Sequence, residues 1–235
     1  MNVDQSELAK FSELAAKWWD LDGEFKPLHQ INPLRSDYIN DACQSIGGLT
    51  GKTLLDIGCG GGILAEAMVA RGASVTGIDL AEASLEVARL HGLESGLKAN
   101  YECISAEDKA ANTPEPFDIV TCLEMLEHVP EPASIVNSAA ALVKSGGKVF
   151  FSTLNRNPKS YLMAILGAEY LLKMVPKGTH DYSKFIKPSE LMRMIDQTDL
   201  IIEHCTGLHY HPLQCQYYLS DKNIDVNYII TCRKP

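Results

Sequence analysis

Short apolar runs alternate with amphipathic stretches through the middle of the chain. The runs predict strands near residues 53–57, 74–79, 100–104, 117–122 and 147–153, with helices between them. Strands that are apolar at successive positions are typical of parallel sheets, because helices cover both faces of such a sheet. The pattern therefore predicts an α/β, Rossmann-like fold that binds ligands at the carboxyl ends of its strands.

The ends of this alternation can also be read from the pattern. Apolar runs at 199–204 and 226–233 predict two final strands, which would form an antiparallel end to the sheet. Gly72 and Gly92 are expected to lie just past two helices as C-caps. Residues 155–187 interrupt the alternation before a helix from Pro188 to Asp196 resumes it. We treat 1–235 as one domain with this insertion after its fifth strand.

The first fifty residues are expected to form a helical cap. Asp4 with Glu7 three residues later resembles a capping box. Asn32-Pro33-Leu34-Arg35 opens a second predicted helix that runs to about Cys43. Arg35 in its first turn is badly placed for the helix macrodipole, which favours cations at the other end. The residues alone therefore favour a surface charge at this position.

The insertion at 155–187 is unusually apolar in its middle and carries lysines around it. One interpretation is a helix that completes the core or closes over a substrate. The other is a surface for an apolar substrate or for an anionic membrane. Its longest apolar run is far shorter than the roughly 20 residues that a spanning helix needs.

Composition narrows the classes of function. The chain has 235 residues, 46% of them hydrophobic, which suits a sizeable core, and a formal net charge of −9. Binding nucleic acid normally takes clustered Lys and Arg, so nucleic acid is not expected as a partner. Seven cysteines without a Cys-x-x-Cys pair are typical of buried thiols in a reducing compartment. With no secretory signal pattern at its start, the chain is expected to be cytoplasmic.

A glycine cluster follows the first predicted strand. The pattern is Asp-x-Gly-x-Gly-x-Gly, from Asp56 through Gly58 and Gly60 to Gly62. A dinucleotide fingerprint needs glycine at the sixth position, where Ile63 stands, so the pattern favours the first motif of class I S-adenosylmethionine (SAM) methyltransferases. A plain strand-to-helix turn without a ligand would also use such glycines.

Asp79 ends the next predicted strand. An acid at that place could accept hydrogen bonds from both hydroxyls of an adenosine ribose. Because NAD and SAM share this ribose, Asp79 supports the fold more than the choice of cofactor.

A second group of polar residues follows the fourth strand. Glu124, Glu127 and His128 are spaced i, i+3, i+4, so a helix would point all three the same way. Two carboxylates and an imidazole could hold a divalent cation, or supply a base beside an acid that orients it. A polar cap on a short helix remains the alternative.

Several motifs together resemble the family of ubiquinone biosynthesis O-methyltransferases. They are the glycine cluster, Glu124-Met125-Leu126-Glu127-His128-Val129-Pro130, Phe151-Ser152-Thr153-Leu154-Asn155-Arg156-Asn157 and Val175-Pro176-Lys177-Gly178-Thr179-His180-Asp181. The last two are specific to this family, and the resemblance covers nearly the whole chain. It departs most between Pro212 and Lys222.

The resemblance implies a SAM-dependent enzyme that acts at two steps of ubiquinone synthesis, as 2-polyprenyl-6-hydroxyphenol methylase and as 3-demethylubiquinol 3-O-methyltransferase. Its implied partners are a polyprenylated phenol or catechol, a ubiquinone-biosynthesis complex and peripheral contact with membrane lipid. Carried over to this sequence, Arg35 would contact the methionine end of SAM and Asp79 the ribose. Gly58 and Leu123 would each contact the cofactor through their own main chain. Eukaryotic relatives imply Mg²⁺ at Glu124, Glu127 and His128.

Methyl transfer to a phenol needs a base or a metal, because a phenol of pKa about 10 is mostly protonated at neutral pH. We therefore expect either His128 as the base or Mg²⁺ on Glu124, Glu127 and His128. The alternatives are a SAM methyltransferase for another small phenol and a SAM-binding assembly protein without turnover. An NAD oxidoreductase is opposed by Ile63.

Overall fold

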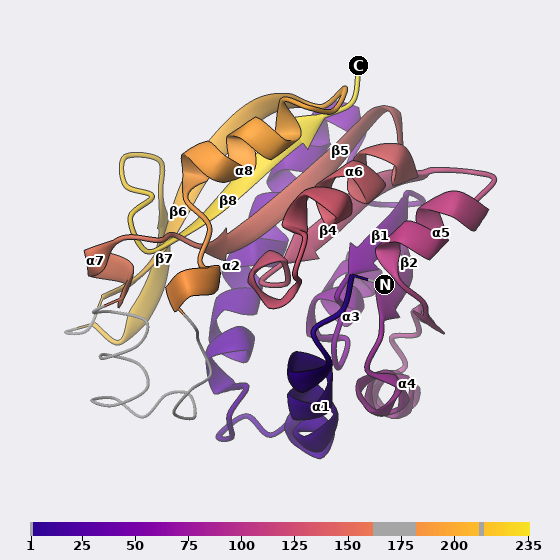
Figure 1. Ribbon diagram of the computed structural model, residues 1–235. Helices are drawn as coiled ribbons and strands as arrows, with labels where there is room; N and C mark the ends of the chain where they lie inside the picture. The colour runs from indigo at the N-terminus through magenta and orange to yellow at the C-terminus, as the bar shows by residue number, and fades with distance from the viewer. Residues whose placement is uncertain (1, 162–181, 212–213) are drawn as a thin grey trace.

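The computed structural model describes residues 2–161, 182–211 and 214–235, and its centre is an eight-stranded sheet (Figure 1). The strands lie in the order β3-β2-β1-β4-β5-β8-β6-β7. Their bounds are β1 Thr53–Ile57, β2 Ser74–Asp79, β3 Asn100–Cys103, β4 Phe117–Leu123, β5 Val143–Leu154, β6 Ile201–His211, β7 Gln216–Ser220 and β8 Asn227–Arg233.

β1 to β5 pair with one another in parallel, and every pairing that involves β6, β7 or β8 is antiparallel, as the sequence predicts for the two parts of the sheet. Two final strands were expected, but there are three. The missed strand is β7, whose residues are all partly exposed, so it lacks the buried apolar run that marks the others. β8 lies between β5 and β6 in the sheet.

Helices cover both faces of the sheet (Figure 1). One apolar cluster joins the strands to α2 (Lys26–Cys43), α3 (Ile63–Ala70) and α4 (Glu82–Ser95). The other joins them to α5 (Ala106–Asn112), α6 (Pro132–Leu142) and α8 (Pro188–Ile195). In β1, Leu54 belongs to the first cluster while Leu55 and Ile57 belong to the second, as the alternation of side chains along a strand requires.

Two predicted helix boundaries are wrong. α2 begins at Lys26, not at Asn32, because Pro27 at its first turn loses no hydrogen bond there. Arg35 therefore lies inside α2, where it is only 6% exposed, and the surface-charge interpretation is wrong. Gly72 follows α3 with φ +90° as expected, but α4 continues through Gly92 and ends at Gly96, whose φ is +75°.

The remaining short elements lie at the carboxyl ends of the parallel strands, except the turn Gln44–Ile46, which lies before the amino end of β1. They are α1 (Gln5–Glu13), α7 (Pro158–Ser160) and the 3₁₀ turns η1 Ala15–Lys17, η2 Gln44–Ile46, η3 Leu126–His128 and η5 Tyr182–Lys184. Asp4 caps α1 through Ser6 N, but Glu7 does not complete the capping box. Its carboxylate reaches elsewhere, as described below.

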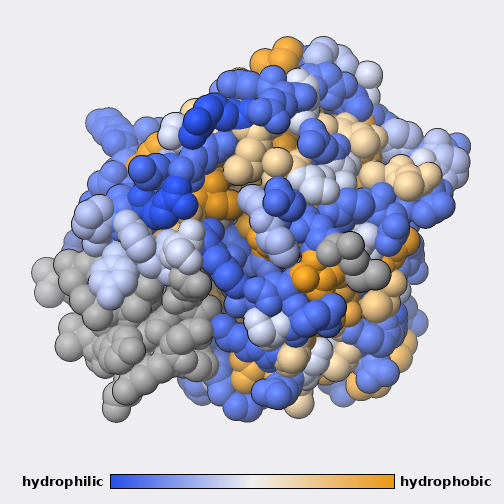
Figure 2. All heavy atoms as spheres, viewed as in Figure 1, coloured by the Kyte–Doolittle hydropathy of each residue, from blue (hydrophilic) through white to orange (hydrophobic). Residues whose placement is uncertain are grey.

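The apolar middle of the predicted insertion lies outside the described residues, which omit 162–181. Within the described ranges, no helix has both the length and the apolar character needed to cross a bilayer. The face seen in Figure 2 is mostly hydrophilic, with its hydrophobic residues in small groups.

Candidate active site

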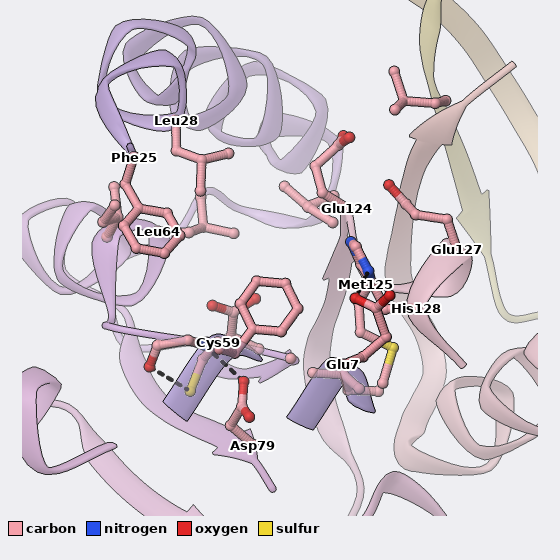
Figure 3. Close-up of a pocket in the computed structure, with 18 of the residues that line it drawn as sticks. Glu7, Phe25, Leu28, Cys59, Leu64, Asp79, Glu124, Met125, Glu127 and His128 are labelled. Carbon is pink, nitrogen blue, oxygen red and sulfur yellow. Dashed lines mark hydrogen bonds and ion pairs between the residues drawn. The ribbon is translucent and has the colours of Figure 1, made fainter. Parts of the chain in front are cut away.

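A cavity of about 650 Å³ opens at the carboxyl ends of the parallel strands. Its walls come from α1, α2, the glycine loop, the end of β2, the segment after β4 and the β6–β7 hairpin. Small-molecule sites occupy about 300–1,000 Å³ and use this edge of an α/β sheet. In Figure 3, Glu7, Met125, Glu127 and His128 line one side and Phe25, Leu28 and Leu64 another, with Asp79 near the glycine loop.

The glycine loop needs its glycines. Gly58, Gly60 and Gly62 have φ values of +72°, +52° and +84°, a region that side chains with a Cβ rarely adopt. A Cβ on Gly58 would lie 2.5 Å from Met125 Cγ, and one on Gly60 would lie 2.4 Å from the Trp18 indole. The loop backbone is thus approached closely by two of the chain's own side chains, one of them from the N-terminal cap.

Trp18 and its neighbour Trp19 hold the cap against this loop. Trp18 is buried, stacks on Phe25 at 3.8 Å between ring centroids, and donates a hydrogen bond to Ser84 Oγ at 3.0 Å. Trp19 turns the other way, stacks on His91, and donates to Gly61 O at 2.9 Å. The cap and the glycine loop therefore form one packed unit.

Asp79 lies at the end of β2 and lines the cavity. Its two carboxylate oxygens accept hydrogen bonds from the backbone N–H groups of Gly60 and Ala81, each at 2.9 Å. Burial raises the pKa of this carboxyl, and the backbone hydrogen bonds oppose that rise. Asp79 thus shapes the loop as well as facing the cavity, and each oxygen keeps a second lone pair for a ligand.

Asp56 is the acid of the glycine motif. It is 3% exposed and accepts a hydrogen bond from Thr121 Oγ1 at 2.7 Å. Burial raises its pKa to about 7. Its hydrogen bond ties the end of β1 to β4.

Arg35 and Glu124 form a buried ion pair beside the cavity. Arg35 Nη2 donates to Glu124 Oε1 at 2.6 Å, which also accepts from Ser152 Oγ at 2.6 Å. Glu124 Oε2 accepts from Asn227 Nδ2 at 2.8 Å. The buried Arg35 Nε and Asn227 Oδ1 have no hydrogen-bond partner in the described part of the chain. The N–H of Arg35 Nε could therefore donate to a polar ligand, and Asn227 Oδ1 could accept from one.

The segment after β4 does not form the helical face that the spacing suggested. Glu124 has φ +55° and lies before η3, so its side chain turns toward Arg35. Glu127 is buried in η3 and accepts a hydrogen bond from Thr153 Oγ1 at 2.7 Å. His128 Nδ1 lies 2.9 Å from Glu7 Oε2. The three predicted side chains share a cavity wall, but each has a different partner.

This arrangement does not fit a divalent cation. Among residues 2–161, 182–211 and 214–235, no cluster of three or more His, Cys, Asp or Glu could hold a metal ion. The guanidinium of Arg35 already neutralises Glu124 at 2.6 Å, and a cation there would be repelled. Mg²⁺ stays a prediction without support from this geometry.

Burial raises the pKa of Glu127 to about 7, and the nearby Glu124 carboxylate adds to the rise. Glu7 shows the opposite behaviour: its hydrogen bond with His128 lowers its pKa to about 2. The Glu7 carboxylate is therefore ionised beside His128, whereas burial favours the protonated form of Glu127.

Sequence reasoning missed three residues at this site: Glu7, Ser152 and Asn227. Trp18 lines the cavity, and the pair Trp18-Trp19 predicts that one of the two reaches a cleft or a partner, because both cannot face the same side of a helix. Ser152 lies in the family-specific motif of β5. Glu7 had been assigned to a capping box, and no local pattern links it to His128, which is 121 residues away.

The fold and the glycine loop define the class of this protein, a methyltransferase with a Rossmann-like sheet. The family model for a methyltransferase domain matches residues 29–204. A solved magnesium protoporphyrin IX methyltransferase from Synechocystis PCC 6803, with bound S-adenosylhomocysteine, shares the fold with a TM-score of 0.70 at 16% identity, covering 99% of this chain and 100% of that one. The predicted α/β class is confirmed.

The chain belongs to the ubiquinone biosynthesis O-methyltransferase family. It is 61% identical to that protein from Vibrio parahaemolyticus, over 99% of this chain and 97% of the relative. It is 58% identical to the one from Aeromonas salmonicida, over 100% and 97%. The predicted family and the predicted enzyme class, a SAM-dependent O-methyltransferase, are confirmed.

Proposed function

We propose that this chain transfers the methyl group of SAM to a ring hydroxyl of a polyprenylated catechol or hydroxyphenol in ubiquinone biosynthesis, with His128 as the general base. The observation that carries the proposal is the cavity, whose lining includes His128 together with Arg35, Gly58, Asp79 and Leu123. The full-length identity to ubiquinone biosynthesis O-methyltransferases supports the substrate class.

The cofactor end of the cavity fits SAM on two observations. The buried Arg35 Nε has no hydrogen-bond partner among the described residues and can donate to the carboxylate of the methionine end. Asp79 reaches the cavity from the end of β2 and keeps lone pairs for the ribose hydroxyls. Gly58 and Leu123 also line the cavity, and we expect their backbone to contact the cofactor.

SAM supplies an activated methyl group on its sulfonium, so little covalent chemistry remains for the protein. The chain must hold the phenol oxygen in line with that methyl group and take up its proton. Alignment of two reactants contributes about 7–11 kcal/mol. His128 lies on the cavity wall, and the carboxylate of Glu7 can accept the hydrogen bond of its Nδ1–H, which leaves Nε2 to take up the proton of the substrate.

The test is transfer of a radiolabelled methyl group from SAM to a prenylated catechol, with an unprenylated catechol alongside and each reaction run in EDTA and in Mg²⁺. We expect labelled product from the prenylated substrate, with activity retained in EDTA because the described acids already have partners. Activity that is lost in EDTA and restored by Mg²⁺ would instead support the metal form of the reaction. SAM binding without product from either catechol would favour the non-catalytic assembly protein.

Equal transfer to prenylated and unprenylated catechols would favour a methyltransferase for another small phenol. Peripheral contact with anionic membrane lipid, membership of a ubiquinone-biosynthesis complex and a cytoplasmic location also stay predictions. The lipid prediction rests on the apolar, lysine-flanked sequence at 155–187. Co-sedimentation with anionic vesicles tests it, and the absence of binding would contradict it.

A further inference from the structure

The N-terminal helix α1 supplies a carboxylate to the side chain that we assign as the base. Glu7 Oε2 lies 2.9 Å from His128 Nδ1, and the two side chains are 17% and 18% exposed. The next turn of α1 adds Phe11, whose ring meets the His128 ring edge to face at 5.1 Å between centroids. Two residues of one helix, four positions apart, therefore hold the imidazole from neighbouring directions.

The Glu7 carboxylate is itself fixed. Lys184 Nζ, from η5, lies 3.3 Å from Glu7 Oε1 and 2.9 Å from Asp4 Oδ2. One oxygen of Glu7 thus faces an ammonium group while the other faces the imidazole. This arrangement ties α1 to the segment that precedes α8 and limits rotation of the carboxylate.

The other acids near His128 are occupied elsewhere. Glu127 Oε2 accepts the hydroxyl of Thr153, and both oxygens of Glu124 accept from the group formed by Arg35, Ser152 and Asn227. Glu7 is the acid in hydrogen-bond contact with the ring among the described residues. The acid that orients the imidazole therefore comes from α1, not from the Glu-x-x-Glu-His segment.

The charge state of Glu7 selects one form of the imidazole. An ionised carboxylate can only accept a hydrogen bond, so the neutral ring must carry its proton on Nδ1. Nε2 then keeps its lone pair, and it has no hydrogen-bond partner in the described part of the chain. A base that receives a proton from a substrate in the cavity needs this tautomer.

We propose that Glu7 is a positioning residue that holds His128 as its Nδ1–H tautomer. Helix α1 would then both line the cavity and set the tautomer of the base. The proposal rests on the proposed function only where it concerns turnover. The tautomer itself is a property of the protein without substrate.

The decisive variant is Glu7→Gln, measured by ¹⁵N NMR of histidine-labelled protein and by steady-state kinetics. In Glu7→Gln the ammonium of Lys184 retains the amide oxygen as its acceptor, so the amide NH2 faces Nδ1 and donates to it. The ring proton would then lie on Nε2, and Nε2 would lose its basic lone pair. We expect the wild-type His128 signals to report a proton on Nδ1 and those of Glu7→Gln to report it on Nε2. We expect kcat to fall at least tenfold while KM for SAM stays within about twofold.

Two further variants on α1 serve as controls. Asp4→Asn weakens the contact with Lys184 but leaves Glu7 beside His128, and Asn remains a good helix N-cap. It should keep the wild-type tautomer. Glu13→Gln changes an exposed acid of the same helix and should leave kcat unchanged. Glu7→Asp, which keeps the charge, should retain the Nδ1–H signal even where its shorter reach lowers kcat.

The inference is overturned if Glu7→Gln keeps the Nδ1–H tautomer, or if Asp4→Asn switches the tautomer as completely as Glu7→Gln does. A wild-type signal with the proton on Nε2 would also overturn it. If no substrate is methylated by any form, the proposed function fails while the NMR result still decides the role of Glu7.

Discussion

The glycine loop and the His128 side of the cavity are built from the chain in different ways. The loop and Asp79 come from one continuous stretch, and their geometry follows from backbone conformation, with Gly58 and Gly60 at positive φ. The His128 side is assembled from α1, η3, β5 and β8, which are far apart in the sequence. A cofactor site of the first kind leaves a local motif, whereas a side-chain network of the second kind leaves none.

The largest predicted effect is on turnover and comes from replacing His128. His128→Ala should lower kcat by about 10²- to 10⁴-fold, the usual contribution of a general base, and should leave the Kd for SAM nearly unchanged. Stopped reactions with labelled SAM measure the rate and equilibrium dialysis the affinity. His204→Ala is a matched control, because His204 is largely exposed on β6 and lies outside the cavity lining. A kcat within threefold of wild type for His128→Ala would remove the base assignment.

Arg35→Met should have the next largest effect, on stability. It leaves Glu124 buried without its cation, and breaking such a pair costs roughly 3–5 kcal/mol. Urea unfolding of the SAM-free protein measures it. Arg71→Met is the contrasting variant, because Arg71 pairs with Asp37, which is 68% exposed, and surface pairs contribute at most about 1 kcal/mol. Equal losses in the two variants would show that the buried network is not a stability element.

Asp79→Asn should act mainly on the cofactor. It weakens the hydrogen bonds to the N–H groups of Gly60 and Ala81, and a lost charge-assisted hydrogen bond costs about 1.5–3 kcal/mol. The expected result is a Kd for SAM raised by roughly 10- to 150-fold, measured by calorimetry, with a smaller effect on kcat. Asp118→Asn is the control: Asp118 binds Thr53 N at 2.8 Å near the opposite edge of the sheet. It should lower stability and leave SAM affinity unchanged.

The smallest predicted effect concerns Asp56. Burial raises its pKa from 3.8 to about 7, so the folded protein holds a proton there that the unfolded chain releases. The free energy of unfolding therefore falls as pH rises from about 4 to 7. Asp56→Asn has no charge to bury, so its stability relative to wild type should be greater at pH 8 than at pH 4.

Denaturant titrations across this pH range measure the difference. Glu115→Gln, an exposed acid, should follow the wild-type pH dependence. If Asp56→Asn does the same, the Asp56 carboxylate is not buried in the way described.

The sequence predicts the sheet better than the site, and particular residues show why. Strands β1, β4 and β8 are buried at successive positions and so have apolar runs that mark them in the sequence, whereas β7 lacks such a run and was missed. Gly92 resembled a helix end, but it sits inside α4, where a Cβ would lie 3.1 Å from Leu97 O. Close packing against Leu97 explains why a glycine stands there, and such packing cannot be predicted from the spacing of residues along the chain.

The candidate site shows the same limit. Arg35, Gly58, Asp79 and Leu123 line one cavity, and their contact with SAM stays a prediction. The orientation of Glu124 depends on its φ of +55° and on partners from α2 and β8. The partner of His128 comes from α1. Both depend on tertiary contacts that have no counterpart in the spacing of the motif.

The position of β8 also bears on how the protein reaches this structure. β5 pairs with β8 along its whole buried half, with Phe150 opposite Thr231 and Leu154 opposite Asn227. While the chain is being synthesised, the hydrogen-bonding edge of β5 stays open until residues 227–233 have emerged. Exposed apolar edges promote aggregation, and pairing between distant strands is slow. We therefore expect the newly made chain to depend on chaperones, and loss of β8 to give insoluble protein rather than an impaired enzyme.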